Sequence, residues 1–99
     1  MSFTRAAFLL SAGPLAWAAH FLAIYGFTGV ACARGLAASV PWFVAGATVV
    51  AAVACALVMR VALRHRDGFE CWLSASLCAM ALLAIAWEAL TVLLVAPCA

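Results

Sequence analysis

The chain has 99 residues, of which 72% are hydrophobic and 8% are charged, and its mean hydropathy is +1.29. Soluble domains carry about 45–50% apolar and about 25% charged residues, and a soluble domain this small has too little interior to bury so much apolar surface. These values exclude a soluble globular domain and predict a protein embedded in a lipid bilayer. A net charge of +2 on scattered arginines excludes a nucleic-acid-binding face.

Three apolar segments predict helices at about residues 6–31, 41–63 and 71–96. Each holds at least about 18 consecutive residues without Lys, Arg or Asp, which is long enough to cross a hydrocarbon core of about 30 Å. In lipid every backbone polar group must be bonded within its own segment, so the segments are expected to be helical. The sequence therefore predicts one all-α membrane domain, residues 1–99, with three transmembrane helices.

The first segment contains Pro14, which allows two interpretations. Pro14 either kinks a helix over 6–31 or opens a shorter helix over 14–31 with Ser11 as its cap, and both are long enough to span. The residues 16–18, Ala-Trp-Ala, resemble a signal-peptide cleavage site. The apolar run continues well beyond them, which favours a membrane helix over a cleaved leader.

Polar and turn-forming residues mark the ends of the other two helices. Pro41 suits the first turn of the second helix, with Ser39 as a possible cap. The pair Asp67-Gly68 predicts a turn before the third helix, and Glu70 suits the positive end of that helix. Pro97 is expected to end it.

The arginines predict the orientation of the chain in the membrane. Four of them, Arg5, Arg60, Arg64 and Arg66, fall at the N-terminus or between the second and third helices, whereas the other loop holds only Arg34. With three spans, the N-terminus and the second loop share one side. By the positive-inside rule that side is cytoplasmic, so the C-terminus is expected to be periplasmic.

Two ionisable residues fall inside the predicted spans at similar depth. At 1.5 Å per residue, His20 lies about 16 Å and Glu88 about 12 Å below the outer boundary. Such residues are costly in lipid and usually face the interior of a bundle, so a His20–Glu88 hydrogen bond is expected, with Thr91 able to extend it. The pair either fixes how the first and third helices face each other or takes part in proton transfer or cofactor contact.

Two tryptophans lie close to this pair along the chain. Trp17 is one turn from His20, and Trp87 adjoins Glu88. Neither is at the headgroup depth where Trp usually gathers, and an indole N–H buried in lipid needs a partner. Trp17, Trp87 and Thr91 are therefore candidates for contact with a partner protein, with simple packing as the alternative.

The five cysteines separate by their position across the membrane. Cys32 and Cys98 fall at the outer ends of the first and third helices, so they form the one plausible disulfide, whereas the other three lie within the helices or near the cytoplasmic side. Cys55 and Met59 are spaced as soft Cu(I) ligands would be, but no CxxC or MxxM motif accompanies them. No metal site and no cofactor bound by this chain alone are predicted.

One pattern resembles a known group of proteins. The residues Trp17-x-x-His20-Phe21-x-x-x-Tyr25-Gly26, followed by Cys32, Trp87 and Pro97-Cys98, resemble small bacterial membrane proteins that accompany haem–copper cytochrome c oxidases, particularly of the caa3 type. The resemblance covers the first and third helices and little of the second. It implies a multi-pass protein of the bacterial inner membrane with oxidase subunits as partners, and it adds Tyr25 to the partner-contact candidates.

The sequence contains no phosphate-binding loop, catalytic triad or pair of catalytic carboxylates, so the chain alone is not expected to be an enzyme. The predicted function is a non-catalytic accessory subunit or assembly factor of a membrane respiratory complex. The alternative is a small homo-oligomeric transporter or proton conduit that uses His20 and Glu88. A purely structural membrane protein is the third possibility.

Overall fold

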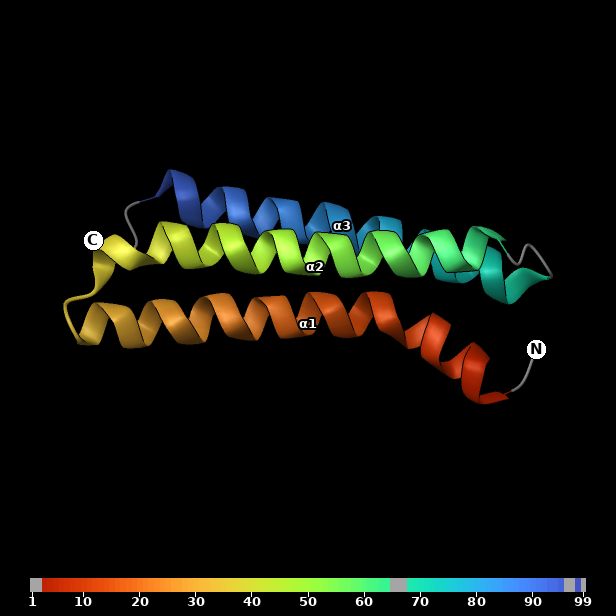
Figure 1. The fold of residues 1–99 in the computed structure, drawn as a ribbon. Helices are drawn as coiled ribbons and strands as arrows, with labels where there is room; N and C mark the ends of the chain where they lie inside the picture. The colour runs from red at the N-terminus through yellow and green to blue at the C-terminus, as the bar shows by residue number, and fades with distance from the viewer. Residues whose placement is uncertain (1–2, 65–67, 96–97, 99) are drawn as a thin grey trace.

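The computed structural model describes residues 3–64, 68–95 and 98, and these residues form three long helices packed side by side (Figure 1). The helices are α1 (Phe3–Ala33), α2 (Val40–Arg64) and α3 (Phe69–Leu94), with a short 3-10 helix, η1 (Ala37–Ser39), before α2. No strand occurs within the described ranges. All three helices are long and apolar enough to cross a membrane. The predicted all-α architecture with three candidate spans is confirmed.

Helix α1 is continuous through Pro14, so the interpretation in which Pro14 opens the helix is wrong. The ring of Pro14 removes a backbone N–H and crowds the preceding turn, which bends a helix without ending it. The red N-terminal part of α1 accordingly runs at an angle to the rest (Figure 1). Ser11 does not cap a helix, because its hydroxyl donates to the carbonyl of Ala7 at 2.7 Å within α1.

Helix α1 ends at Ala33, two residues later than predicted, and Gly35 follows it. Gly35 has φ +70°, a left-handed conformation that suits glycine. The N–H of Leu36 donates to the carbonyl of Ala31 at 2.8 Å, and the N–H of Gly35 points to the carbonyl of Cys32 at 3.5 Å. This is the Schellman pattern, which satisfies carbonyls that the end of a helix leaves free.

The ends of α2 and α3 differ in part from the sequence-based prediction. Pro41 lies in the first turn of α2, as predicted, but Ser39 does not cap that helix, because its hydroxyl donates back to the carbonyl of Leu36. Glu70 lies in the first turn of α3 after Gly68, which has φ +98°. Helix α3 ends at Leu94, two residues before the predicted end, and Asp67 and Pro97 lie outside the described residues.

The helices α1 and α3 approach each other closely at Gly13. A Cβ atom at Gly13 would lie 3.1 Å from backbone atoms of Leu77 and Cys78, so only glycine fits without moving the helices apart. Near this crossing, the buried hydroxyl of Ser74 donates to the carbonyl of Leu9 at 2.6 Å. Small residues at a helix interface permit such close approach in lipid.

Candidate intramembrane polar site

Two apolar clusters lie on either side of a polar layer in the bundle. The cluster toward the α1–α2 turn consists of Ile24, Ala31, Val40, Val44 and Ala89, with Phe27 and Val92 packed on it. The other cluster consists of Cys55, Ala81 and Ile85, with Ala16, Ala51 and Leu82 packed on it. One polar residue on each helix falls between the members of the two clusters, namely His20 on α1, Thr48 on α2 and Glu88 on α3. We refer to these three residues as the polar layer. The packing on both sides fixes the position of this layer along the bundle.

The polar layer joins all three helices through His20. Its Nδ1 lies 3.1 Å from Oε2 of Glu88 on α3, and its Nε2 lies 3.0 Å from Oγ1 of Thr48 on α2. The Thr48 hydroxyl also donates to the carbonyl of Val44 at 2.7 Å. The His20 side chain is fully buried, whereas 13% of the Glu88 side chain remains accessible. Both imidazole nitrogens are therefore held, and the ring is fixed in position.

The structure brings His20 and Glu88 together but gives Thr91 a different role from the predicted one. The hydroxyl of Thr91 donates to the carbonyl of Trp87 at 2.8 Å within its own helix, and it lies on an exposed part of α3. Thr48 takes the place in the network that was expected for Thr91. A signal for Thr48 existed, because it is the one hydroxyl residue of α2 and lies about 10 Å from Pro41 at 1.5 Å per residue, close to the depth of Glu88.

Three aromatic side chains form a row along α1, next to the buried His20. The ring centroids of Trp17 and Phe21 are 6.0 Å apart, and those of Phe21 and Tyr25 are 4.6 Å apart. Trp17 is 40% and Tyr25 51% exposed. No hydrogen bond joins the Trp17 indole or the Tyr25 hydroxyl to another described residue. We refer to Trp17, Phe21 and Tyr25 as the aromatic row.

Trp87 does not extend the aromatic row. Its side chain is 73% exposed on α3, and within the described ranges no ring contact joins it to Trp17 or Tyr25. At about 100° per residue, Trp87 falls on the opposite side of α3 from the buried Ile85.

An apolar groove runs between α1 and α2 beside the polar layer. Its volume is about 600 Å³, and small residues form most of its walls, including Ala16, Ala19, Ala23, Ala47 and Ala51. His20 also contributes to its lining. Because both nitrogens of that ring already have partners, the groove offers no free polar group of the described residues to a ligand. The groove is open and apolar and is not a built polar site.

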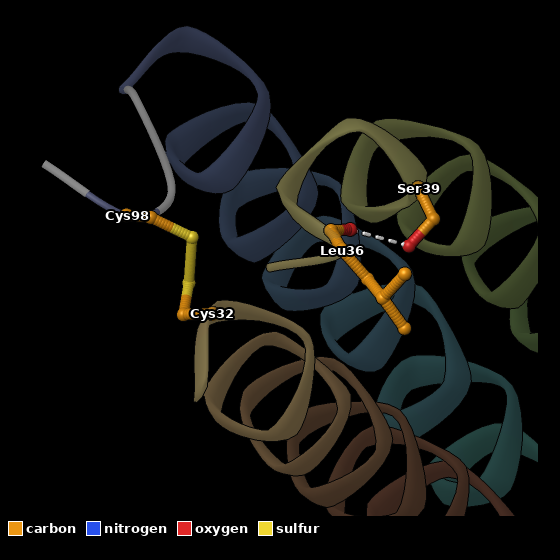
Figure 2. Close-up of a disulfide and its surroundings, with 4 residues drawn as sticks. All are labelled: Cys32, Leu36, Ser39 and Cys98. Atoms are coloured by element: carbon orange, nitrogen blue, oxygen red, sulfur yellow. Dashed lines mark hydrogen bonds between the residues drawn. A yellow bond between two sulfur atoms is a disulfide. The ribbon is translucent and has the colours of Figure 1, made fainter. Parts of the chain in front are cut away.

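The predicted disulfide is present at one end of the bundle. The Sγ atoms of Cys32 and Cys98 are bonded, and the two Cα atoms are 5.6 Å apart (Figure 2). The bond joins the C-terminal end of α1 to the chain beyond α3. Cys55, Cys71 and Cys78 are buried and take no part in this disulfide. Within residues 3–64, 68–95 and 98, no three His, Cys, Asp or Glu side chains gather as a metal site would require.

Comparison with known proteins assigns no function to the polar site, which is therefore interpreted from its own chemistry. The resemblance to proteins that accompany cytochrome c oxidases stays a prediction that rests on short motifs. The chain matches no protein-family model, no curated protein and no solved structure.

Proposed function

We propose that this chain is a non-catalytic accessory subunit or assembly factor of a larger membrane complex, most specifically of a haem–copper cytochrome c oxidase. The aromatic row is the observation that supports a partner. Its indole N–H and phenol O–H have no partner among the described residues and lie within the predicted span, where an unsatisfied polar group costs several kcal/mol. A protein that covers the row supplies acceptors and buries large aromatic surface.

The internal polar groups support a structural role for this chain within that complex. His20, Thr48 and Glu88 bond to one another across α1, α2 and α3, so they fix how the helices face each other. Interhelical bonds of this kind contribute about 0.6 kcal/mol on average, which sets orientation more than stability. The aromatic row is thereby presented at a defined angle. The oxidase as partner rests on the resemblance of the motifs around Trp17, His20 and Tyr25.

Copurification from the membranes of the source organism tests the proposal. A tagged chain extracted in mild detergent is expected to bring down a haem-containing complex, identified by its optical spectrum and subunit masses. The double variant Trp17→Leu, Tyr25→Phe is expected to reduce that yield at least about tenfold, which corresponds to 1.4 kcal/mol of contact energy. Trp72→Leu is the matched control, because Trp72 is an exposed tryptophan at the first turns of α3.

Two results would contradict the accessory role. One is migration of the tagged chain alone in mild detergent, together with normal oxidase levels in a deletion strain. The other is an equal loss of yield in the double variant Trp17→Leu, Tyr25→Phe and in Trp72→Leu, which would show a general effect of removing exposed aromatic side chains. Capture of a haem-free partner through the aromatic row would support the role of this chain as a subunit but would rule out the oxidase as its partner.

A homo-oligomeric transporter or proton conduit is the alternative function, and one observation favours it. The Glu88 side chain keeps 13% of its surface accessible while it bonds to the buried His20, so the pair can be reached from the bundle surface. This function requires several copies, because three helices enclose no pathway. Proteoliposomes are then expected to show proton flux that His20→Ala abolishes. Absence of proton flux in proteoliposomes that contain the unaltered protein would rule out this function.

A further inference from the structure

The Thr48 hydroxyl determines which nitrogen of His20 carries a proton. A hydroxyl has a single proton to donate, and that of Thr48 goes to the carbonyl of Val44 at 2.7 Å. Toward His20 Nε2, 3.0 Å away, Thr48 Oγ1 then offers only a lone pair. A hydrogen bond at this contact requires that Nε2 carries the proton and donates it.

A second proton must lie between His20 and Glu88. With Nε2 protonated, Nδ1 of a neutral ring has a bare lone pair, and it faces Glu88 Oε2 at 3.1 Å. If Glu88 were a carboxylate, a lone pair of Oε2 would face the lone pair of Nδ1, and no hydrogen bond could form between them. Either the carboxylic acid donates to Nδ1, or the imidazolium donates to the carboxylate. Both forms contain the same number of protons and carry no net charge, which suits a group inside a bilayer.

Loss of that proton requires the Thr48 hydroxyl to turn. The deprotonated pair has a carboxylate on Glu88 and a neutral ring with its remaining proton on Nδ1. Nε2 is then an acceptor, and the Thr48 hydroxyl satisfies it only by leaving the carbonyl of Val44. Oγ1 is within hydrogen-bond distance of both acceptors, so the heavy atoms need not move. The change removes one proton and leaves one negative charge in the layer.

No described charge compensates for that negative charge. The nearest titratable groups are Tyr25 on α1, Cys55 on α2 and Cys78 on α3, which lie about 8, 10 and 15 Å from the layer along their helices at 1.5 Å per residue. None of them is a cation at neutral pH. Arg60, Arg64 and Glu70 lie farther away, at the far ends of α2 and α3. Only the form that keeps the proton leaves the layer without a net charge.

We propose that His20 and Glu88 form an intramembrane proton-binding site that holds one proton between them and releases it together with rotation of the Thr48 hydroxyl. The partly accessible Glu88 side chain is the point of exchange, because the His20 side chain is fully buried. A base or water that reaches the α1–α3 face takes the proton. The site is a property of this chain and does not depend on which partner covers the aromatic row.

Nitrogen-15 NMR of histidine-labelled protein in lipid nanodiscs tests the site directly. A His65→Asn background leaves His20 as the one histidine of the chain. At neutral pH, His20 is expected to show a protonated Nε2. At alkaline pH it is expected to convert to a ring with protonated Nδ1 and bare Nε2. A bare Nε2 at neutral pH, or a protonated Nε2 retained up to the alkaline limit of folding, would overturn the proposal.

Two variants separate Glu88 from a general effect of removing an acid. The amide of Glu88→Gln donates to Nδ1 as the carboxylic acid does, so it is expected to keep Nε2 protonated and abolish the alkaline conversion. Glu70→Gln removes the acid in the first turn of α3 and is expected to leave the conversion unchanged. A conversion that persists in Glu88→Gln, or disappears in Glu70→Gln, shows that another group binds the proton.

Discussion

Thr48 and Thr28 show that the contribution of a buried hydroxyl to stability depends on whether it has a hydrogen-bond partner. Oγ1 of Thr48 lies 3.0 Å from Nε2 of His20, whereas Oγ1 of Thr28 is buried with no hydrogen-bond partner among the described residues. Removing one partner of a buried hydrogen bond leaves the other unsatisfied, which costs about 1–3 kcal/mol. Removing a hydroxyl that has no partner costs nothing of this kind.

Thr48→Val is therefore expected to destabilise the protein by about 1–2 kcal/mol, because it strands the Nε2–H of His20. Thr28→Val, the same change in chemistry and volume, is expected to stay within about 0.5 kcal/mol of the unaltered protein. Steric-trap or denaturant unfolding in bicelles gives both values. Equal losses in the two variants would show that Thr48 contributes only packing.

At the residue scale, the sequence predicted the His20–Glu88 contact from depth and cost alone. An ionisable group inside a span has few places to go, so two such groups at one depth tend to meet. Thr48 escaped prediction because a helical threonine usually satisfies itself on its own backbone, as Thr91 does. Whether a hydroxyl has a second partner depends on helix rotation, which the pattern of a nearly all-apolar helix does not specify.

At the scale of helices, the close approach at Gly13 sets the contact between α1 and α3. Gly13→Ala places a methyl group 3.1 Å from backbone atoms of Leu77 and Cys78, which no side-chain rotation relieves. We expect a loss of about 1–3 kcal/mol, the range for overpacking. Gly26→Ala in the same helix meets open space and is expected to be neutral or stabilising.

Unfolding measurements on the two glycine variants decide this prediction. A Gly13→Ala protein as stable as Gly26→Ala would mean that α1 and α3 stand farther apart than in this structure. Ser74→Ala provides an independent probe of the same crossing, because it removes the donor to the carbonyl of Leu9. Its expected cost is about 1 kcal/mol.

The number and approximate position of the helices were predictable because spanning a bilayer fixes a minimum apolar length. Their ends were not, since α1 ends through the backbone geometry of Gly35 and α3 stops two residues before the predicted position. Pro14 could not be assigned either, because proline tolerates both the first turn and a kinked interior. The contact of Gly13 with the backbone of α3 depends on where the two helices cross. The sequence does not determine this point, because many alanines and glycines could equally well lie at a close crossing.

At the scale of the whole molecule, the Cys32–Cys98 bond closes a loop between the ends of α1 and α3, with a sequence separation of 66. Chain-entropy estimates give about 4 kcal/mol for such a loop, and less when the unfolded chain stays in the membrane. Reductant is expected to lower the unfolding midpoint of the unaltered protein. Cys32→Ser is expected to unfold at that lower midpoint with or without reductant.

Thiol labelling followed by mass spectrometry checks the bond itself. Without reductant, Cys32 and Cys98 are expected to resist alkylation, while the buried thiols Cys55, Cys71 and Cys78 label after denaturation. Free labelling of both end cysteines without reductant would show that the bond is absent. The loop, and the stability assigned to it, would then be withdrawn.

The orientation of the bundle is a separate prediction. The arginines favour a cytoplasmic N-terminus, which places the α1–α2 turn outside. Leu36→Cys and Phe69→Cys introduce thiols at exposed positions on opposite ends of the bundle. An impermeant maleimide applied to intact cells is expected to label the first and to reach the second only after permeabilisation. The reverse pattern would invert the topology.

The disulfide also has a consequence for biogenesis. Cys32 is translated long before Cys98, and on the predicted three-span topology the two reach the same side only after α2 and α3 have both crossed the bilayer. A chain whose third helix fails to insert keeps Cys98 on the side opposite Cys32, and its bond cannot form. On this topology the oxidised state of the pair is expected to record that membrane insertion has run to completion, and an intermediate halted after α2 is expected to carry Cys32 as a reduced thiol.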